Sequence, residues 1–107
     1  MKSKKSYVHY EPLGTAGIIS PWNYPLATPI ITSVEALIAG NNVVLKPSEH
    51  TPLTSKCIKK IWDDIIGYKL AFQIVNGGAE VGDMLVCSKD TDIICFTGST
   101  AVGRKIA

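Results

Sequence analysis

The chain has 107 residues, of which 46% are hydrophobic and 19% charged, a composition typical of one small globular domain and not of a disordered chain. Its net charge of +2 comes partly from lysines among the first five residues, and no basic stripe with interleaved aromatic residues follows, which disfavours nucleic-acid binding. No apolar run approaches the about 20 residues of a membrane span, and the N-terminus lacks the apolar segment of a secretory signal. We therefore expect a cytoplasmic protein with no membrane or nucleic-acid partner.

The first half of the chain alternates between strand and helix patterns. Residues 17–19 predict a short strand, and apolar residues at helical spacing over 30–38 predict a helix that ends at a glycine. Residues 42–45 return to strand-forming side chains. A second helix is predicted from an N-cap at Thr51, with proline at its first position, to about Gly67.

The second half repeats the same alternation. A strand is predicted over 72–75, a helix over 79–86 and a strand over 92–96, and a last helix opens at Gly98 and Ser99. The order β-α-β-α-β-α-β-α predicts an α/β fold, a parallel sheet with helices on its faces. Right-handed crossovers bring the loops that follow the strands to one edge of such a sheet, where ligands of open α/β sheets bind.

The loops at that edge are rich in polar residues. Lys46 and Glu49 can each hydrogen-bond a sugar hydroxyl, one as donor and the other as acceptor, but they also fit a solvated ion pair on the surface. Asn23, between two prolines, fits an ordinary turn residue. Each of these residues, taken alone, therefore has a structural as well as a functional interpretation.

The turn at Gly98 and Ser99 has two interpretations as well. The free N–H groups of a helix start attract an anion, and glycine allows a phosphate to approach closely. The same turn also fits an ordinary helix cap by Ser99 or Thr100. It is not the Gly-x-Gly-x-x-Gly dinucleotide fingerprint, because four residues separate Gly98 from Gly103.

The three cysteines do not suggest a disulfide framework or a metal site. Cys57, Cys87 and Cys95 form no Cys-x-x-Cys pair and have no histidine nearby at ligand spacing. We expect reduced thiols, with Cys57 buried on the apolar face of a helix and Cys95 buried in a strand. Nothing marks Cys87 as a nucleophile.

Taken together and in order, these segments resemble the aldehyde dehydrogenase superfamily. The motifs that carry the resemblance are Glu11-Pro12-Leu13-Gly14, Pro21-Trp22-Asn23-Tyr24-Pro25, Ala39-Gly40-Asn41, Lys46-Pro47-Ser48-Glu49, Thr51-Pro52-Leu53-Thr54, Gly77-Gly78 and Phe96-Thr97-Gly98-Ser99-Thr100. Each is weak alone, but together they follow the family's order and spacing over nearly the whole chain. The resemblance implies a Rossmann-like domain that binds NAD or NADP.

The resemblance also assigns roles at the cofactor site. Lys46 and Glu49 would bind the adenosine ribose, and Ser99 and the turn after Gly98 would bind the pyrophosphate. Gly78 and Val102 would border the adenine. The implied cofactor-binding residues are Ile19, Ser20, Pro21, Trp22, Lys46, Ser48, Glu49, Gly78, Phe96, Thr97, Gly98, Ser99 and Val102. A carboxylate at the ribose repels a 2′-phosphate, so Glu49 favours NAD over NADP.

In that family a cysteine thiolate attacks an aldehyde, a hydride passes to the nicotinamide, and a carboxylic acid forms. The side-chain amide that matches Asn23 holds the oxyanion. The family's nucleophilic cysteine and general-base glutamate lie downstream of the segment that matches 96–107, and none of the three cysteines here takes a matching position. We therefore expect the chain alone to be inactive.

The resemblance further implies that this chain is a fragment, truncated at both ends relative to the family. We divide it into a frayed segment, 1–10, and a partial NAD(P)-binding domain, 11–107. Intact relatives are homo-oligomers that act on small-molecule aldehydes. The alternative hypotheses are a stand-alone nucleotide-binding or interaction module without catalysis, which the uncovered strand edges of a partial sheet disfavour, and the product of a decayed gene.

Overall fold

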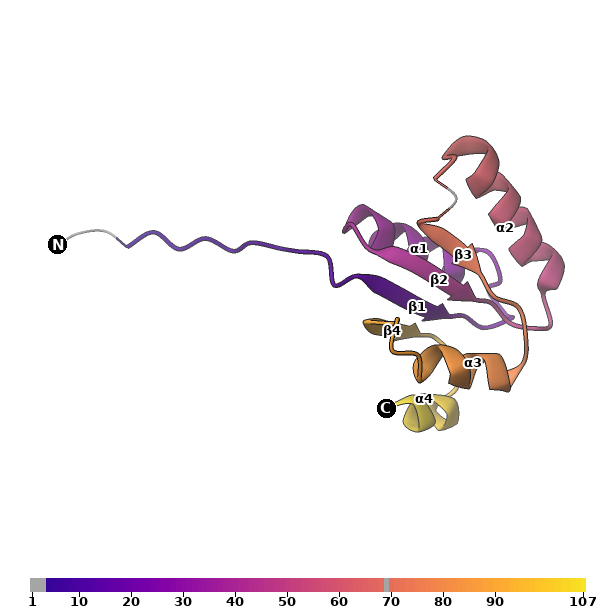
Figure 1. The fold of residues 1–107 in the computed structure, drawn as a ribbon. Coiled ribbons are helices and arrows are strands. Elements are labelled where there is room, and N and C mark those ends of the chain that lie inside the picture. The colour runs from indigo at the N-terminus through magenta and orange to yellow at the C-terminus, as the bar shows by residue number, and fades with distance from the viewer. Residues whose placement is uncertain (1–3, 69) are drawn as a thin grey trace.

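The computed structural model describes residues 4–68 and 70–107, and within these ranges strands and helices alternate as predicted (Figure 1). In chain order the elements are β1 Thr15–Ile19, α1 Ala27–Ile38, β2 Asn42–Lys46, α2 Pro52–Ile65, β3 Phe72–Ile74, α3 Ala79–Val86, β4 Ile93–Phe96 and α4 Thr100–Ile106. The predicted limits of α3 match the structure at both ends. The other limits differ by a few residues at most, so the element prediction is confirmed.

The strands form one parallel sheet in the order β3-β2-β1-β4. In the sheet, Ile18 of β1 lies between Leu45 of β2 and Cys95 of β4, and Val43 of β2 pairs with Phe72 of β3. Because all strands run the same way, their carboxyl ends meet at one edge. This arrangement confirms the predicted α/β class.

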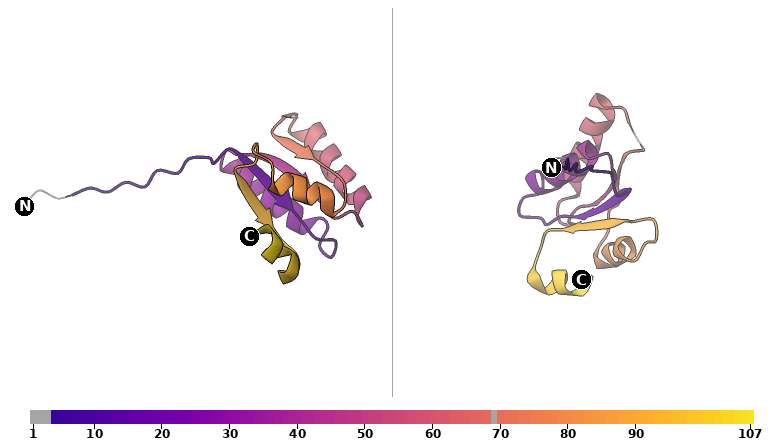
Figure 2. Two further views of the ribbon diagram at one scale, coloured as in Figure 1. Left: turned by 60° about the horizontal axis from the view of Figure 1, so that its bottom comes forward. Right: turned by 90° about the vertical axis from the view of Figure 1, so that its left-hand side faces the viewer.

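The helices lie on both sides of the sheet. Figure 2 shows α1 and α2 on one side and α3 and α4 on the other. The core lies under α1 and α2, and its fully buried members alternate along the strands as a parallel sheet requires. They are Ala16, Ile18, Val43, Leu45 and Phe72, joined by Ile58 of α2. The ring of Trp62 completes this layer, with its centroid 5.0 Å from that of Phe72.

On the opposite face, α3 approaches the sheet closely over Gly17. A Cβ atom at this position would lie 2.7 Å from Cδ1 of Ile94 in β4 and 3.1 Å from Cγ of Leu85 in α3, so a larger residue would force both side chains to shift. The outer strands of this face are less covered. An open hollow of about 740 Å³, lined in part by Val44, Gln73 and Met84, lies over β2 and β3.

Residues 4–14 contain no helix or strand, and most of them extend away from the domain (Figure 1). Asn41 fixes the point at which this segment joins the sheet. Its Oδ1 accepts hydrogen bonds from the N–H groups of Leu13 and Gly14, at 2.7 and 3.0 Å, and its Nδ2 donates to the carbonyl of Ala36 at 3.1 Å. The division at residue 10 stays a prediction, and residues 1–3 lie outside the described ranges.

The structure corrects the predicted burial of Cys57, which is exposed, whereas Cys95 is half-buried against the core. The reason is the position of α2, which packs on the edge strand β3. Only one narrow line of its side chains, Ile58 and Trp62, therefore reaches the core. Ile65, which follows Ile58 by two helical turns, is exposed.

The start of α2 lies where it was predicted, but the expected side-chain capping hydrogen bond is not formed. Thr51 is the N-cap and a proline occupies the first turn, but the Thr51 side chain caps no helix N–H. Its Oγ1 lies 3.5 Å from the carbonyl oxygen of Ser48 instead.

Among the described residues, no helix combines the length and apolar character that crossing a membrane requires.

Two isoleucines of α2 test which face of this helix stabilises the fold. Ile58 is 6% exposed and Ile65 is 77% exposed. We expect Ile58→Ala to lower the free energy of unfolding by about 2–5 kcal/mol, because it leaves a cavity in the core. The matched control, Ile65→Ala, should change it by no more than about 0.5 kcal/mol. Urea unfolding followed by circular dichroism measures both, and equal losses would contradict this packing.

Candidate functional site

Backbone hydrogen bonds beyond the ends of the strands hold the loops of the carboxyl edge side by side. The N–H of Ser20 donates to the carbonyl of Lys46 at 3.2 Å, and the N–H of Thr97 donates to the carbonyl of Ile19 at 3.0 Å. The loops after β1, β2 and β4 therefore start from fixed, neighbouring positions. This is the convergence predicted from the order of elements.

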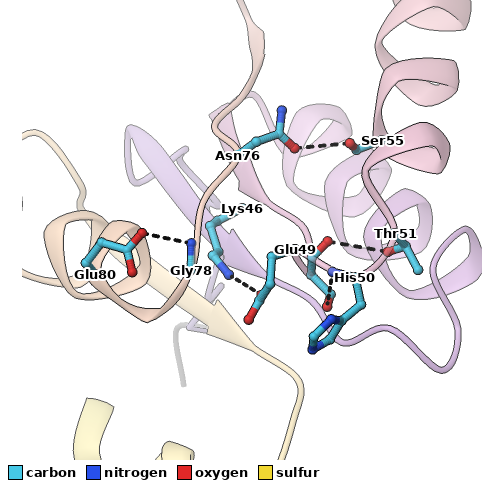
Figure 3. Close-up of polar contacts among 9 residues, drawn as sticks. Lys46, Glu49, His50, Thr51, Ser55, Asn76, Gly78 and Glu80 are labelled. Carbon is cyan, nitrogen blue, oxygen red and sulfur yellow. Dashed lines mark hydrogen bonds and ion pairs between the residues drawn. The ribbon is translucent and has the colours of Figure 1, made fainter.

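The loop after β2 brings Glu49 back over Lys46 (Figure 3). The N–H of His50 donates to Oγ of Ser48 at 3.2 Å, and the N–H of Thr51 donates to the carbonyl of Ser48 at 3.2 Å, which closes a tight turn. Nζ of Lys46 lies 3.2 Å from Oε2 of Glu49. The Lys46 side chain is only 7% exposed and that of Glu49 is 48% exposed. The pair therefore has its lysine buried at the end of the sheet and its carboxylate accessible to solvent.

The charges of this pair suit hydrogen bonding to a ligand. A hydrogen bond from its own backbone N–H, and then the hydrogen bond from Lys46, lower the pKa of Glu49 below its ordinary value of 4.5. At neutral pH the carboxylate therefore accepts hydrogen bonds. An ammonium group has three hydrogens to donate, and Glu49 takes one of them, so Lys46 can donate further.

A pocket of about 270 Å³ lies beside this pair, and we call it the edge pocket. The ends of β1 and β2 and the loop after β2 form its base, and α3 and α4 form its two walls. The lining residues are Ile19, Lys46 and Glu49 at the base, Ala79, Gly82, Asp83 and Val86 on α3, and Val102, Lys105 and Ile106 on α4. Four of the predicted cofactor residues, Ile19, Lys46, Glu49 and Val102, are thus brought together.

Gly78 lies at the start of the α3 wall without lining the edge pocket. Its N–H donates to Oε1 of Glu80 at 3.0 Å, and a Cβ atom there would lie 2.7 Å from Oε2 of the same residue (Figure 3). Glu80 thus places its own negative charge at the start of α3, where the helix dipole favours it. The neighbouring Asn76 accepts a hydrogen bond of 3.2 Å from Oγ of Ser55, which ties this loop to α2.

At the last turn, the structure shows the cap that the sequence allowed. Ser99 is the N-cap of α4, and its Oγ accepts a hydrogen bond from the N–H of Val102 at 3.3 Å. The ring of Phe96 lies where a side chain on Gly98 would point. Phe96, Thr97, Gly98 and Ser99 together line a separate open hollow of about 470 Å³. The binding of a phosphate at this turn stays a prediction.

The residues after β1 lie in different surroundings. Ser20 is buried, and its Oγ has no hydrogen-bond partner among the described residues. Trp22 and Asn23 are exposed and Pro21 is half-buried. Asn23 lines a hollow of about 400 Å³ at the start of α1 and does not reach the edge pocket. Neither this hollow nor the edge pocket has a cysteine in its lining.

Sequence reasoning missed two charged residues of the edge pocket, Asp83 and Lys105. Each has a faint signal in the sequence. Asp83 follows Ala79 by four residues, and Lys105 follows Val102 by three, so each shares a helix face with a residue of the pocket wall. Ser48, which was predicted to bind the cofactor, is buried in its own loop and supports the turn that carries Glu49.

The sequence profile of the Aldehyde dehydrogenase family matches residues 1–107. The chain belongs to the aldehyde dehydrogenase family. It is 43% identical over 103 residues to a betaine aldehyde dehydrogenase of Bacillus subtilis (strain 168), with 95% of this chain and 21% of that relative covered. It is 41% identical over 104 residues to a putative succinate-semialdehyde dehydrogenase [NADP(+)] of Mycolicibacterium smegmatis, with 96% and 20% covered. The chain spans about a fifth of the length of these aldehyde dehydrogenases.

Solved structures of aldehyde dehydrogenases share the fold. An aldehyde dehydrogenase from Bartonella henselae superposes with a TM-score of 0.88 at 38% identity, over 92% of this chain and 21% of that one. The NAD⁺ complex of an aldehyde dehydrogenase from Bacillus cereus gives a TM-score of 0.87 at 36% identity, over 92% and 20%. These matches confirm the predicted family and the predicted fold class.

The Lys46–Glu49 pair predicts a pH dependence of stability. Because the pKa of Glu49 is lower in the folded chain than when unfolded, the unfolded chain binds more protons at acid pH. The contribution of the pair should therefore be complete above pH 4.5 and should fall as the pH drops through the lowered pKa. Glu49→Gln should remove this pH dependence and cost at most about 1 kcal/mol at neutral pH, since Glu49 is half exposed.

Urea unfolding over a series of pH values from neutral to acid measures this effect. The control is Glu35→Gln, which alters an exposed glutamate of α1 that has no ion pair among the described residues. If both variants change the pH dependence of the free energy of unfolding by a similar amount, the pair makes no contribution of its own.

Proposed function

We propose that this chain binds the adenosine half of NAD, as the cofactor-binding part of an aldehyde dehydrogenase that oxidises an aldehyde to a carboxylic acid. One observation carries the proposal: Lys46 and Glu49 stand together at the base of a pocket that two helices enclose. This position is the carboxyl edge of a parallel sheet, where ligands of open α/β folds bind.

The ribose is the part of the cofactor that Lys46 and Glu49 hold in this proposal. The ammonium group donates to one hydroxyl while the ionised carboxylate accepts from another. A 2′-phosphate would face the negative charge of Glu49, so we propose a preference for NAD over NADP. Relatives include a protein described as using NADP(+) and a structure solved with NAD⁺, so the family provides support for either cofactor.

Other predicted residues fit neighbouring parts of the same cofactor. Gly78 is the N-cap of α3 and Val102 lies in the first turn of α4, and we place the adenine ring between these two helices. We place the pyrophosphate at the turn of Gly98 and Ser99. The part of the cofactor that leads on to the nicotinamide would follow the loop from Ser20 to Trp22. The buried Oγ of Ser20, which has no partner within residues 4–68 and 70–107, supports this placement, because a buried polar atom normally finds a partner.

The remaining roles concern the complete enzyme. We propose that Asn23 donates its amide hydrogen to the oxyanion formed from the aldehyde, a role in which loss of one donor typically costs about 2.7–4 kcal/mol of barrier. We place the nucleophile and the general base on residues outside this chain. For the nucleophile, the support is that none of the three cysteines lines the hollow beside Asn23. Free cysteines suit the reducing cytoplasm, where we place a homo-oligomeric enzyme.

A second candidate function is a nucleotide-binding module without catalysis. The observation that favours it is that no cysteine lines either the edge pocket or the hollow beside Asn23. Both candidates require adenosine binding, and they differ in whether further residues add the chemistry.

Replacement of Lys46 tests cofactor binding. We expect Lys46→Met to lower the affinity of the chain for NAD by about tenfold, because it removes a hydrogen bond from a charged donor. Isothermal titration calorimetry measures the dissociation constant. Lys56→Met, which removes the same charge from the exposed side of α2, should leave it unchanged. Equal affinities for the wild-type chain and Lys46→Met would contradict the proposed ribose contact.

The proposed absence of a nucleophile predicts no turnover. The purified chain, mixed with NAD and a panel of aliphatic and aromatic aldehydes, should form no NADH, as followed by its fluorescence. The betaine aldehyde dehydrogenase of Bacillus subtilis with betaine aldehyde is the positive control. Steady NADH formation by the chain alone would show that one of its own residues performs the attack.

A further inference from the structure

Two oppositely charged residues line the edge pocket from opposite walls. Asp83 belongs to α3 and Lys105 to α4, and both contribute to the lining. Their side chains form no hydrogen bond or ion pair within residues 4–68 and 70–107, whereas Lys46 and Glu49 pair with each other at the base. The pocket thus holds one free acceptor and one free donor in addition to the pair already described.

The rest of the two walls suits a flat ring. On α3, Ala79 and Gly82 line the pocket with little or no side chain. On α4, Val102 and Ile106 give the pocket an apolar surface. Nothing would contact a Cβ atom built on Gly82 within 4 Å, so the space beside it is open. Drug-sized ligands need pockets of about 300–1,000 Å³, so a pocket of 270 Å³ holds one ring system and not a dinucleotide.

We propose that Asp83 and Lys105 recognise the edge of a purine base and select an adenine over a 6-oxopurine. The inference rests on the proposed function, since it assumes that the base of the cofactor enters this pocket. Adenine presents an amine donor at N6 beside an acceptor at N7. The Asp83 carboxylate accepts from the N6 amine, and the Lys105 ammonium donates to N7.

A 6-oxopurine cannot satisfy the same two groups. It presents acceptors at both O6 and N7, so its carbonyl oxygen faces the carboxylate of Asp83 with no hydrogen between them. Lys105 can still donate to N7 of either base. Asp83 is therefore the specificity-determining residue, and Lys105 contributes affinity for both purines.

The nucleotides 5′-AMP and 5′-IMP test this inference, because they carry the same charge and differ at position 6 of the base. Titration of the ¹⁵N-labelled chain, followed by the amide signals of Gly82 and Val102, gives both the place of binding and the two dissociation constants. We expect the wild-type chain to prefer 5′-AMP by about tenfold, the effect of one hydrogen bond to a charged group.

The variants separate the two roles. Asp83→Asn should bring the two affinities within about twofold of each other, since an amide can donate to O6. Lys105→Met should weaken both nucleotides equally and leave their ratio unchanged. Asp90→Asn and Lys89→Met make the same charge changes on exposed residues outside the pocket and should alter neither affinity nor ratio.

The outcomes distinguish this inference from the proposed function. Binding at the edge pocket with the same preference in Asp83→Asn and in the wild-type chain would overturn base selection by Asp83 and leave the adenosine site in place. If Asp83→Asn and Asp90→Asn lose the preference for 5′-AMP equally, the effect comes from net charge alone, and the inference is overturned too. If neither nucleotide moves the Gly82 and Val102 signals, both the inference and the proposed adenosine site fail.

Discussion

The parallel pairing of β1 with β2 and β4 is the constraint on which the candidate site depends. Its ladder continues past the strands through the bonds from Ser20 to Lys46 and from Thr97 to Ile19. Because the carboxyl ends are level, Lys46 leaves the sheet at a fixed height beside the end of β1. A shift of register by one residue would turn Lys46 to the other face, into the apolar core beneath α1 and α2. The position of the site therefore follows from the sheet before any ligand is considered.

The two faces of the sheet are packed for different tasks. Beneath α1 and α2, large apolar side chains fill a continuous layer that supports the fold. On the other face, α3 touches the sheet chiefly over Gly17 and α4 stands beyond it, which leaves the open spaces where polar groups gather. Burial of Lys46 at the boundary between these faces is tolerated because Glu49 meets its charge. The main apolar core and the candidate site thus lie on opposite sides of one sheet.

The sequence predicted what depends on local patterns and failed where distant packing decides. Periodicity and turn residues were sufficient for the order of elements and for the meeting of the loops after β1, β2 and β4 at one edge, because parallel strands leave their loops few alternatives. The burial of Cys57 was predicted wrongly, since the apolar stripe of α2 is wider than the single edge strand it covers. Asp83 and Lys105 were missed because their common pocket exists only where two helices approach each other in space.

The glycine at position 17 has a consequence far from its own strand. One wall of the edge pocket is α3, whose Leu85 would lie 3.1 Å from a Cβ atom at Gly17. A side chain at this strand position would press on α3 from the sheet side without touching anything bound in the pocket. The position of that wall is therefore sensitive to a residue that does not line the pocket.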